Sequence, residues 1–133
     1  MASLEGKHFV VIGLGKSGIG AASLLLNRGA RVTALDENEK ATAPFTSDRF
    51  TLKKGPFPAK FWEGAEAVVV SPGVPLSKPE LVAAKQAGAV VYGEIELAWR
   101  FRPEGAGPMF GITGTNGKST TTALLGELMK RHE

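Results

Sequence analysis

Two glycine-rich loops, at residues 13–18 and 114–120, do most to limit what this chain can fold into. Each loop follows a short apolar run and precedes a segment whose apolar residues recur at helical spacing. A glycine loop between a buried strand and a helix is typical of parallel α/β sheets, in which the turn leaves the strand at its carboxyl end. The chain has 17 glycines among 133 residues, and many of them stand where a predicted strand gives way to a helix.

Apolar runs and helical patterns alternate along the first hundred residues. We expect strands at residues 8–12, 31–36, 50–53, 67–70 and 90–92, and helices at residues 19–28, 79–87 and 93–100. The polar segment 37–57 is the least regular part. Strands and helices in this order predict right-handed βαβ units and therefore an α/β fold with a Rossmann-like parallel sheet.

The segment at residues 102–108 has two prolines and two glycines, the composition of a linker. We therefore expect a Rossmann-like domain at residues 1–101, a linker at 102–108, and the start of a second domain at 109–133. That second part should hold a strand at 109–113, the second glycine loop and a helix at about 118–131. Because only 15 residues follow Lys118, we expect a truncated unit that is inactive by itself.

Composition excludes several classes of protein. There is no cysteine, which rules out disulfides, thiolate metal sites and a cysteine nucleophile. The 16 basic and 13 acidic residues leave a net charge of +3 without a basic stripe, so we expect no nucleic-acid partner. No apolar run approaches the ~20 residues that cross a bilayer, and no signal-peptide pattern opens the chain. We expect a cytoplasmic protein without a membrane partner.

The first glycine loop fits the pattern G-x-G-x-x-G, with glycines at 13, 15 and 18. Gly13 would allow the tight turn, Gly15 would let the backbone approach a diphosphate, and Gly18 would let helix and strand pack closely. Asp36 follows at the end of the next predicted strand. The pattern alone is weak evidence, and an unliganded βα turn with a solvated acid would show it too. Its place between a strand and a helix favours a nucleotide site.

The second glycine loop has the more specific pattern, G-T-N-G-K-S-T at residues 114–120. In such a loop the backbone N–H groups surround phosphate oxygens, Lys118 reaches the β- and γ-phosphates, and the Ser119 hydroxyl binds Mg²⁺. The loop departs from the usual G-x-x-x-x-G-K-[ST], because Ile112 stands at the first glycine position and the glycine is Gly114. We expect an ATP site at Gly114, Thr115, Asn116, Gly117, Lys118, Ser119 and Thr120.

Four motifs in this order resemble the Mur ligases of peptidoglycan synthesis: GLGKSG, SPGVP, GEIELAW and GITGTNGKSTTT. The resemblance covers essentially the whole chain and about the first third of such an enzyme. The SPG turn together with GEIEL is most similar to the family member that adds D-glutamate. The resemblance implies an ATP-dependent ligase that joins D-glutamate to UDP-N-acetylmuramoyl-L-alanine (UDP-MurNAc-L-Ala) through an acyl phosphate.

In that family the Rossmann-like domain holds the UDP part of the substrate and not NAD. The resemblance implies UDP contacts from Gly15, Lys16, Ser17, Asp36, Glu37 and Gly73. Glu37 would place an acid beside an anionic diphosphate, so we expect its side chain to turn away. The cofactors implied are ATP and Mg²⁺, with Lys118 as the catalytic residue that stabilises the phosphates and Ser119 as the metal ligand.

Two other hypotheses remain open at this stage. The first loop and Asp36 also suit an NAD-binding Rossmann module of an oxidoreductase or regulator, although such a module has no need of Lys118 and Ser119. Alternatively, the chain binds nothing measurable because other domains complete the site. Independently of the ligand, we expect the apolar segment 109–131 to fold back on the sheet, extend away flexibly, or pair with a second copy.

Overall fold

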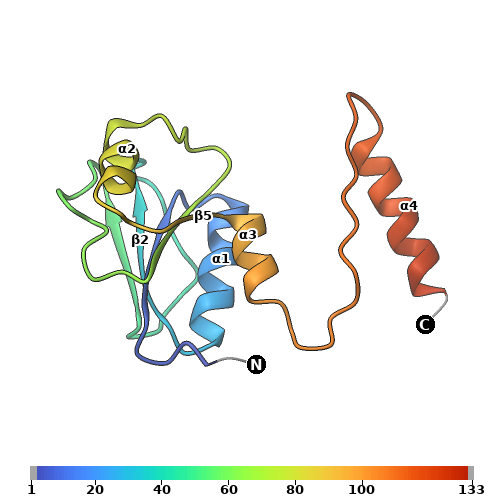
Figure 1. Ribbon diagram of the computed structural model, residues 1–133, viewed down its shortest axis with the longest axis horizontal. Coiled ribbons are helices and arrows are strands. Elements are labelled where there is room, and N and C mark those ends of the chain that lie inside the picture. Colours follow the sequence, from blue (N-terminus) through green and yellow to red (C-terminus); the bar gives the residue numbers. More distant parts are fainter. Residues whose placement is uncertain (1–2, 132–133) are drawn as a thin grey trace.

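The computed structural model describes residues 3–131 and contains a five-stranded sheet (Figure 1). The strand order is β3-β2-β1-β4-β5, and every neighbouring pair is parallel. Pairing is continuous through the central strand, since Phe9 to Ile12 face residues of both neighbours. The expected α/β fold with a Rossmann-like parallel sheet is confirmed. The strands are β1 (His8–Ile12), β2 (Arg31–Asp36), β3 (Phe50–Lys54), β4 (Ala67–Val70) and β5 (Val91–Gly93).

Helices cover both faces of this sheet (Figure 1). Three of the helices pack on it: α1 (Lys16–Asn27) and α3 (Glu94–Arg100) on one face, and α2 (Pro79–Gln86) on the other. A fourth, α4 (Lys118–Lys130), lies apart. The expected helix at 19–28 begins three residues earlier, at Lys16, and the Ile19 N–H bonds the Gly15 carbonyl at 3.0 Å. Apolar spacing gives no sign of this first turn, because it contains no apolar side chain.

The alternation of side chains along β1 supplies both halves of the core. Phe9 and Val11 point to the α1–α3 face, where they pack with Leu25 of α1 and Leu97 of α3. Their neighbours in sequence, Val10 and Ile12, point to the opposite face and pack around Leu81 of α2. A strand buried on both faces requires a continuous apolar run, which explains why the sequence pattern located β1 and β4 correctly.

Helix α3 packs on the sheet through its middle and through the residue that follows it. Leu97 is 1% exposed. Just beyond the helix, the Phe101 ring meets Phe9 edge to face with centroids 6.1 Å apart. Arg28, the residue that caps the C-terminus of α1, donates to the Phe101 carbonyl, and its guanidinium lies 5.8 Å from the centre of the Phe101 ring. The packed unit therefore extends through Phe101.

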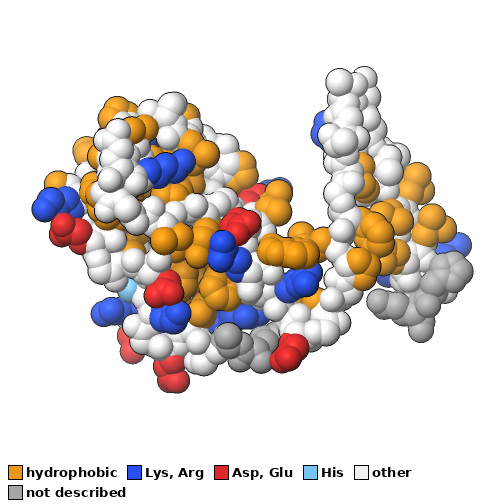
Figure 2. Space-filling model, viewed as in Figure 1, with side chains coloured by type: hydrophobic (Ala, Val, Ile, Leu, Met, Phe, Trp, Pro, Cys, Tyr) orange, Lys and Arg blue, Asp and Glu red, His pale blue; other side chains and the backbone are white. Residues whose placement is uncertain are grey.

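Beyond Phe101 the chain runs away from the sheet and ends in α4 (Figure 1). The expected strand at 109–113 is wrong: these residues pair with no strand among the described residues, and an apolar run without a hydrogen-bonded partner is not a strand. No described residue of α4 is buried. Figure 2 shows apolar side chains gathered over α4 and the segment beside it, where Met109, Phe110, Leu124, Leu128 and Met129 are exposed. The ends of the two expected domains, residues 1–2 and 132–133, lie outside the described residues.

Candidate nucleotide-binding site

The strand order defines a switch point between β1 and β4. From β1 the chain passes through α1 to β2 on one side, and after β3 it returns to place β4 on the other side of β1. In open α/β sheets, ligands bind in the crevice outside the carboxyl ends of the strands at such a point. Here the corresponding region lies outside the first glycine loop and the segment that follows β4, and we refer to it as the crevice.

The first glycine loop is packed tightly against the segment after β4. Gly13 has φ +83°, and its N–H donates to the Leu35 carbonyl at 2.8 Å. The buried Ser71 hydroxyl donates to the Gly13 carbonyl at 2.7 Å. A Cβ on Gly18 would lie only 1.8 Å from that same carbonyl oxygen, so only glycine fits there. Ser71 is a site residue that the sequence analysis did not single out, although the SPG motif contains it.

The N-terminus of α1 opens directly onto this crevice. Its N-cap is Gly15, with φ −67°, no side chain caps the helix, and no acid stands in its first turn. A Cβ on Gly15 would meet nothing within 4 Å, so the absence of a side chain leaves open space beside the helix end. Unpaired N–H groups and the helix dipole favour an anion at such a position. Lys16 is exposed at the start of the helix and Ser17 is half-buried.

Two acids stand at the carboxyl end of β2. The Asp36 carboxylate accepts the Leu14 N–H through Oδ2 at 2.7 Å and the Asn38 N–H through Oδ1 at 2.9 Å, which ties it to the glycine loop. Glu37 lies beside it and forms an ion pair with Lys78, with 2.7 Å between Oε1 and Nζ. Lys78 was not expected at this site, because no sequence pattern links residues 41 positions apart.

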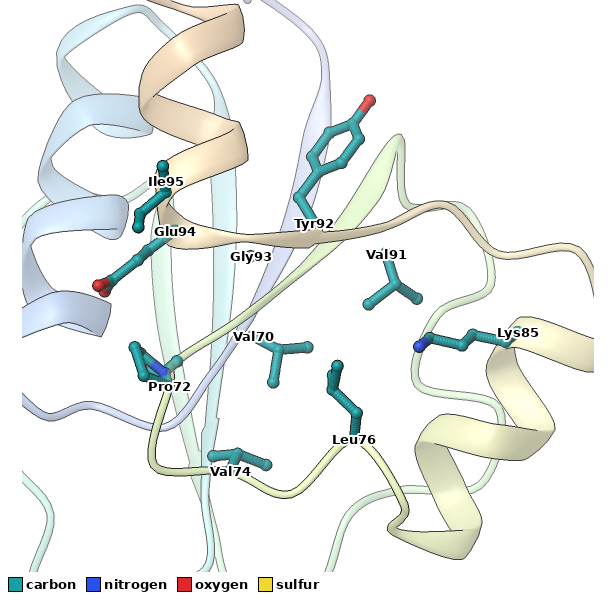
Figure 3. Close-up of a pocket in the computed structure, with 11 residues that line it drawn as sticks. Val70, Pro72, Val74, Leu76, Lys85, Val91, Tyr92, Gly93, Glu94 and Ile95 are labelled. Atoms are coloured by element: carbon teal, nitrogen blue, oxygen red, sulfur yellow. The ribbon is translucent and has the colours of Figure 1, made fainter. Parts of the chain in front are cut away.

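Two cavities lie near the crevice. The first has a volume of about 330 Å³, and in Figure 3 the side chains of Val70, Val74, Leu76 and Val91 point toward one another, with the Lys85 amine beside them. Ser71 and Pro72 also line it. The second cavity, about 320 Å³, lies between α1 and α3 and includes Ser17. The other residues expected at UDP line neither cavity: Gly15, Lys16, Asp36, Glu37 and the exposed Gly73.

The second glycine loop forms a separate, exposed turn at the start of α4 (Figure 1). Gly117 is the N-cap, in the left-handed region with φ 77°, and the Thr121 N–H bonds its carbonyl at 2.9 Å. The Lys118 ammonium folds back and donates to the Gly114 carbonyl. Thr115, Asn116, Ser119 and Thr120 are exposed to solvent. The structure thus keeps the residues expected at ATP together but does not bring them to the first loop.

No metal-binding cluster of three or more His, Asp or Glu side chains occurs within residues 3–131. A magnesium ion at Ser119 would therefore need ligands from bound phosphates, from water or from residues outside this range. Over the same residues, no helix is both long and apolar enough to span a membrane.

Together, the doubly wound sheet and the glycine loop at its switch point define a Rossmann-like domain. The chain belongs to the family described as Mur ligase MurD-like, N-terminal domain, whose profile matches residues 7–93. It is 48% identical over 133 residues to a UDP-N-acetylmuramoylalanine–D-glutamate ligase of Anaeromyxobacter dehalogenans, covering 97% of this chain and 28% of that relative. A ligase of the same description from Myxococcus xanthus is 49% identical over 131 residues, covering 95% and 28%.

A third ligase of this description, from Syntrophotalea carbinolica, is 44% identical over 134 residues, covering 98% of this chain and 29% of the relative. The chain thus spans little more than a quarter of the length of these relatives. Among solved structures, SirC, precorrin-2 dehydrogenase, aligns with a TM-score of 0.45 and 14% identity over 100% of this chain and 69% of that one. This structural similarity is too low to indicate a function for this chain.

Proposed function

We propose that this chain is the N-terminal part of an ATP-dependent ligase that adds D-glutamate to UDP-MurNAc-L-Ala in peptidoglycan synthesis in the cytoplasm. The observation that carries the proposal is the uncapped N-terminus of α1 at the switch point, with open space at Gly15 and a cation at Lys16. The names of the relatives support the same activity, and they disfavour the alternative of an NAD-binding module.

In this proposal the first loop binds the UDP moiety. The N–H groups at Gly15, Lys16 and Ser17 would meet the diphosphate, and the Lys16 ammonium would add a mobile positive charge. Each Asp36 oxygen already accepts one backbone N–H but has a second lone pair free, so the carboxylate can still accept the N–H of a uracil ring. Gly73 would border the nucleotide from the other side of the crevice.

The second loop, residues 114–120, would bind ATP in the second domain, which we assign to residues 109–133, after a Rossmann-like domain at 1–101 and a linker at 102–108. The donors present suit that role: an exposed hydroxyl at Ser119 is a hard ligand of the kind Mg²⁺ prefers, and the Lys118 ammonium can leave the Gly114 carbonyl for a phosphate. Bound Mg²⁺ would offset the charge of the phosphates. Lys118 would stabilise the same charge as the phosphoryl group moves.

The overall reaction forms an amide bond in two steps. The γ-phosphoryl group of ATP passes to the substrate carboxylate, giving an acyl phosphate and ADP. The amine of D-glutamate then attacks the acyl carbon and phosphate leaves. The chain covers little more than a quarter of its relatives' length, and we propose that the remaining ligands and the D-glutamate site belong to the rest of such a ligase. We therefore expect the 133 residues alone to bind and not to catalyse.

Calorimetric titration of the chain with UDP, UDP-MurNAc-L-Ala and NADH tests the proposal. We expect heat from the two uridine ligands and none from NADH. Gly15→Ala should weaken UDP binding about tenfold or more by filling the space at the helix end, while Gly20→Ala, also in open space but further along α1, should not. Heat from NADH alone would overturn the proposal in favour of a dinucleotide module.

A further inference from the structure

The proposed diphosphate site stands beside two carboxylates, which is an unfavourable arrangement for binding an anion. Asp36 and Glu37 are consecutive at the carboxyl end of β2, next to the glycine loop that Asp36 contacts. Like charges repel over several ångströms near a protein surface, since solvent screens them only in part. A site built for phosphate therefore needs both carboxylates to be balanced by local donors.

Asp36 is balanced by the backbone. Its two oxygens take the N–H groups of Leu14 and Asn38 at 2.7 and 2.9 Å. Hydrogen bonds to a charged acceptor are the strong kind, and they hold this carboxylate in a fixed direction. Among the described residues, no such pair of backbone N–H groups bonds the Glu37 carboxylate, so another group must neutralise its negative charge.

The Lys78 ammonium neutralises the negative charge of Glu37. The ammonium lies 2.7 Å from Glu37 Oε1, and the Lys78 side chain is 25% exposed, so solvent screens it less than it does an ordinary surface lysine. The same ammonium lies 5.5 Å from the centre of the Phe57 ring, a cation–π distance. The lysine backbone is held as well: its N–H bonds Pro75 and its carbonyl accepts from Leu81 at the start of α2.

The ion pair spans the carboxyl ends of the central strands, where the nucleotide is proposed to bind. Glu37 follows β2, Lys78 lies between β4 and α2, and β1 with its glycine loop stands between those two strands. The lysine therefore comes from the far side of the switch point to reach the acid.

We propose that Lys78 is a positioning residue of the nucleotide site: it holds and neutralises Glu37, so that a nucleoside diphosphate can bind beside an acid that would otherwise repel it. This inference rests on the proposed function, because it takes the ligand of the first loop to carry phosphate. The proposal gives the two acids different roles: the Asp36 carboxylate contacts the ligand, and the Glu37 carboxylate pairs with Lys78.

The test compares UDP with uridine, which lacks the phosphates, by calorimetric or NMR titration of four variants. Lys78→Gln should weaken UDP binding about fivefold at low ionic strength and leave uridine binding within about twofold, because only the phosphates feel the exposed charge. Lys78→Arg should keep the wild-type affinity for UDP. Glu37→Gln should bind UDP as well as the wild type or better, and the double variant Glu37→Gln with Lys78→Gln should recover most of the loss.

A matched control is available at the amino ends of the strands, on the opposite side of the sheet from the carboxyl ends where the site lies. Lys7 pairs with Glu66 at 2.8 Å, next to the first residues of β1 and β4, so Lys7→Gln removes the same unit of charge far from the site. It should leave both affinities unchanged. Raising the salt to about 0.5 M should shrink the Lys78→Gln effect on UDP to within about twofold.

The outcomes separate the two proposals. If the unsubstituted chain binds neither UDP nor UDP-MurNAc-L-Ala, the proposed UDP-binding role of the first loop in this chain and this inference both fall. If UDP binds but Lys78→Gln leaves its affinity unchanged, or weakens uridine equally, the inference alone is overturned. Should Lys78→Gln fail to fold, Glu37→Gln still decides, because a clear loss of UDP affinity in that variant contradicts a repulsive role for the Glu37 charge.

Discussion

The close approach of α1 to the glycine loop predicts a large difference between two glycine substitutions in one helix. In Gly18→Ala the new Cβ would lie 1.8 Å from the Gly13 carbonyl oxygen and 2.9 Å from the Ser71 hydroxyl, well inside the 3.4 Å at which ordinary contact begins. Backbone must move to relieve this overlap, which breaks the bond between Ser71 and Gly13. We expect Gly18→Ala to lower the free energy of unfolding by about 3 kcal/mol or more.

Gly20→Ala is the matched comparison. Gly20 is exposed in the same helix, and its added Cβ would meet nothing within 4 Å. Since alanine favours a helix interior over glycine by about 0.5–1 kcal/mol, this variant should be slightly more stable than the wild type.

Urea denaturation followed by circular dichroism and by tryptophan fluorescence measures both changes. Trp62 packs against the α2-side core and should report the same transition as the helices. A Gly18→Ala protein with an unfolding free energy within about 1 kcal/mol of the wild type would refute the close packing on which the site geometry depends.

The Ser71 hydrogen bond, the burial of His8 and the exposure of α4 can each be tested separately. Ser71→Ala leaves the Gly13 carbonyl without its donor and should cost about 1–2 kcal/mol in urea denaturation; a change below about 0.3 kcal/mol would contradict this. Burial, with the nearby Arg31, holds the pKa of His8 below its usual 6.5. The folded state then binds fewer protons, so the unfolding free energy should fall as the pH drops below about 6.5, and His8→Gln should remove that part of the pH dependence; an unchanged pH profile would argue against it. Because α4 has 13 residues and none is buried, its amides should exchange hydrogen far faster than those of β1. Protection that rises with protein concentration would instead indicate that residues 109–131 pair between copies, one of the three outcomes expected from the sequence.

The sequence predicted those features that depend on local pattern. Buried parallel strands need apolar runs on both faces, and the glycines at 13 and 18 must follow such a run, so β1, β2 and β4 and the first loop were located within a residue or two. The helix start at Lys16 was missed because Lys16, Ser17 and Gly18 carry no apolar signal. These elements are set by residues close together along the chain.

The remaining features depend on residues distant in sequence. The apolar run at 109–113 looks like a strand, but a strand exists only beside a partner, and none of the residues from 3 to 131 supplies one there. The bond from Ser71 to Gly13 and the pair of Glu37 with Lys78 join residues 58 and 41 positions apart. Only the fold brings them together, so no pattern along the chain could show them.

A crystal structure of the chain soaked with UDP, and in parallel with NADH, would show directly which nucleotide the first loop binds. We expect UDP density with the diphosphate at the N–H groups of Gly15, Lys16 and Ser17, and the base beside Asp36. Nicotinamide dinucleotide seated over that βα turn, with UDP absent from it, would show that the first loop does not bind UDP.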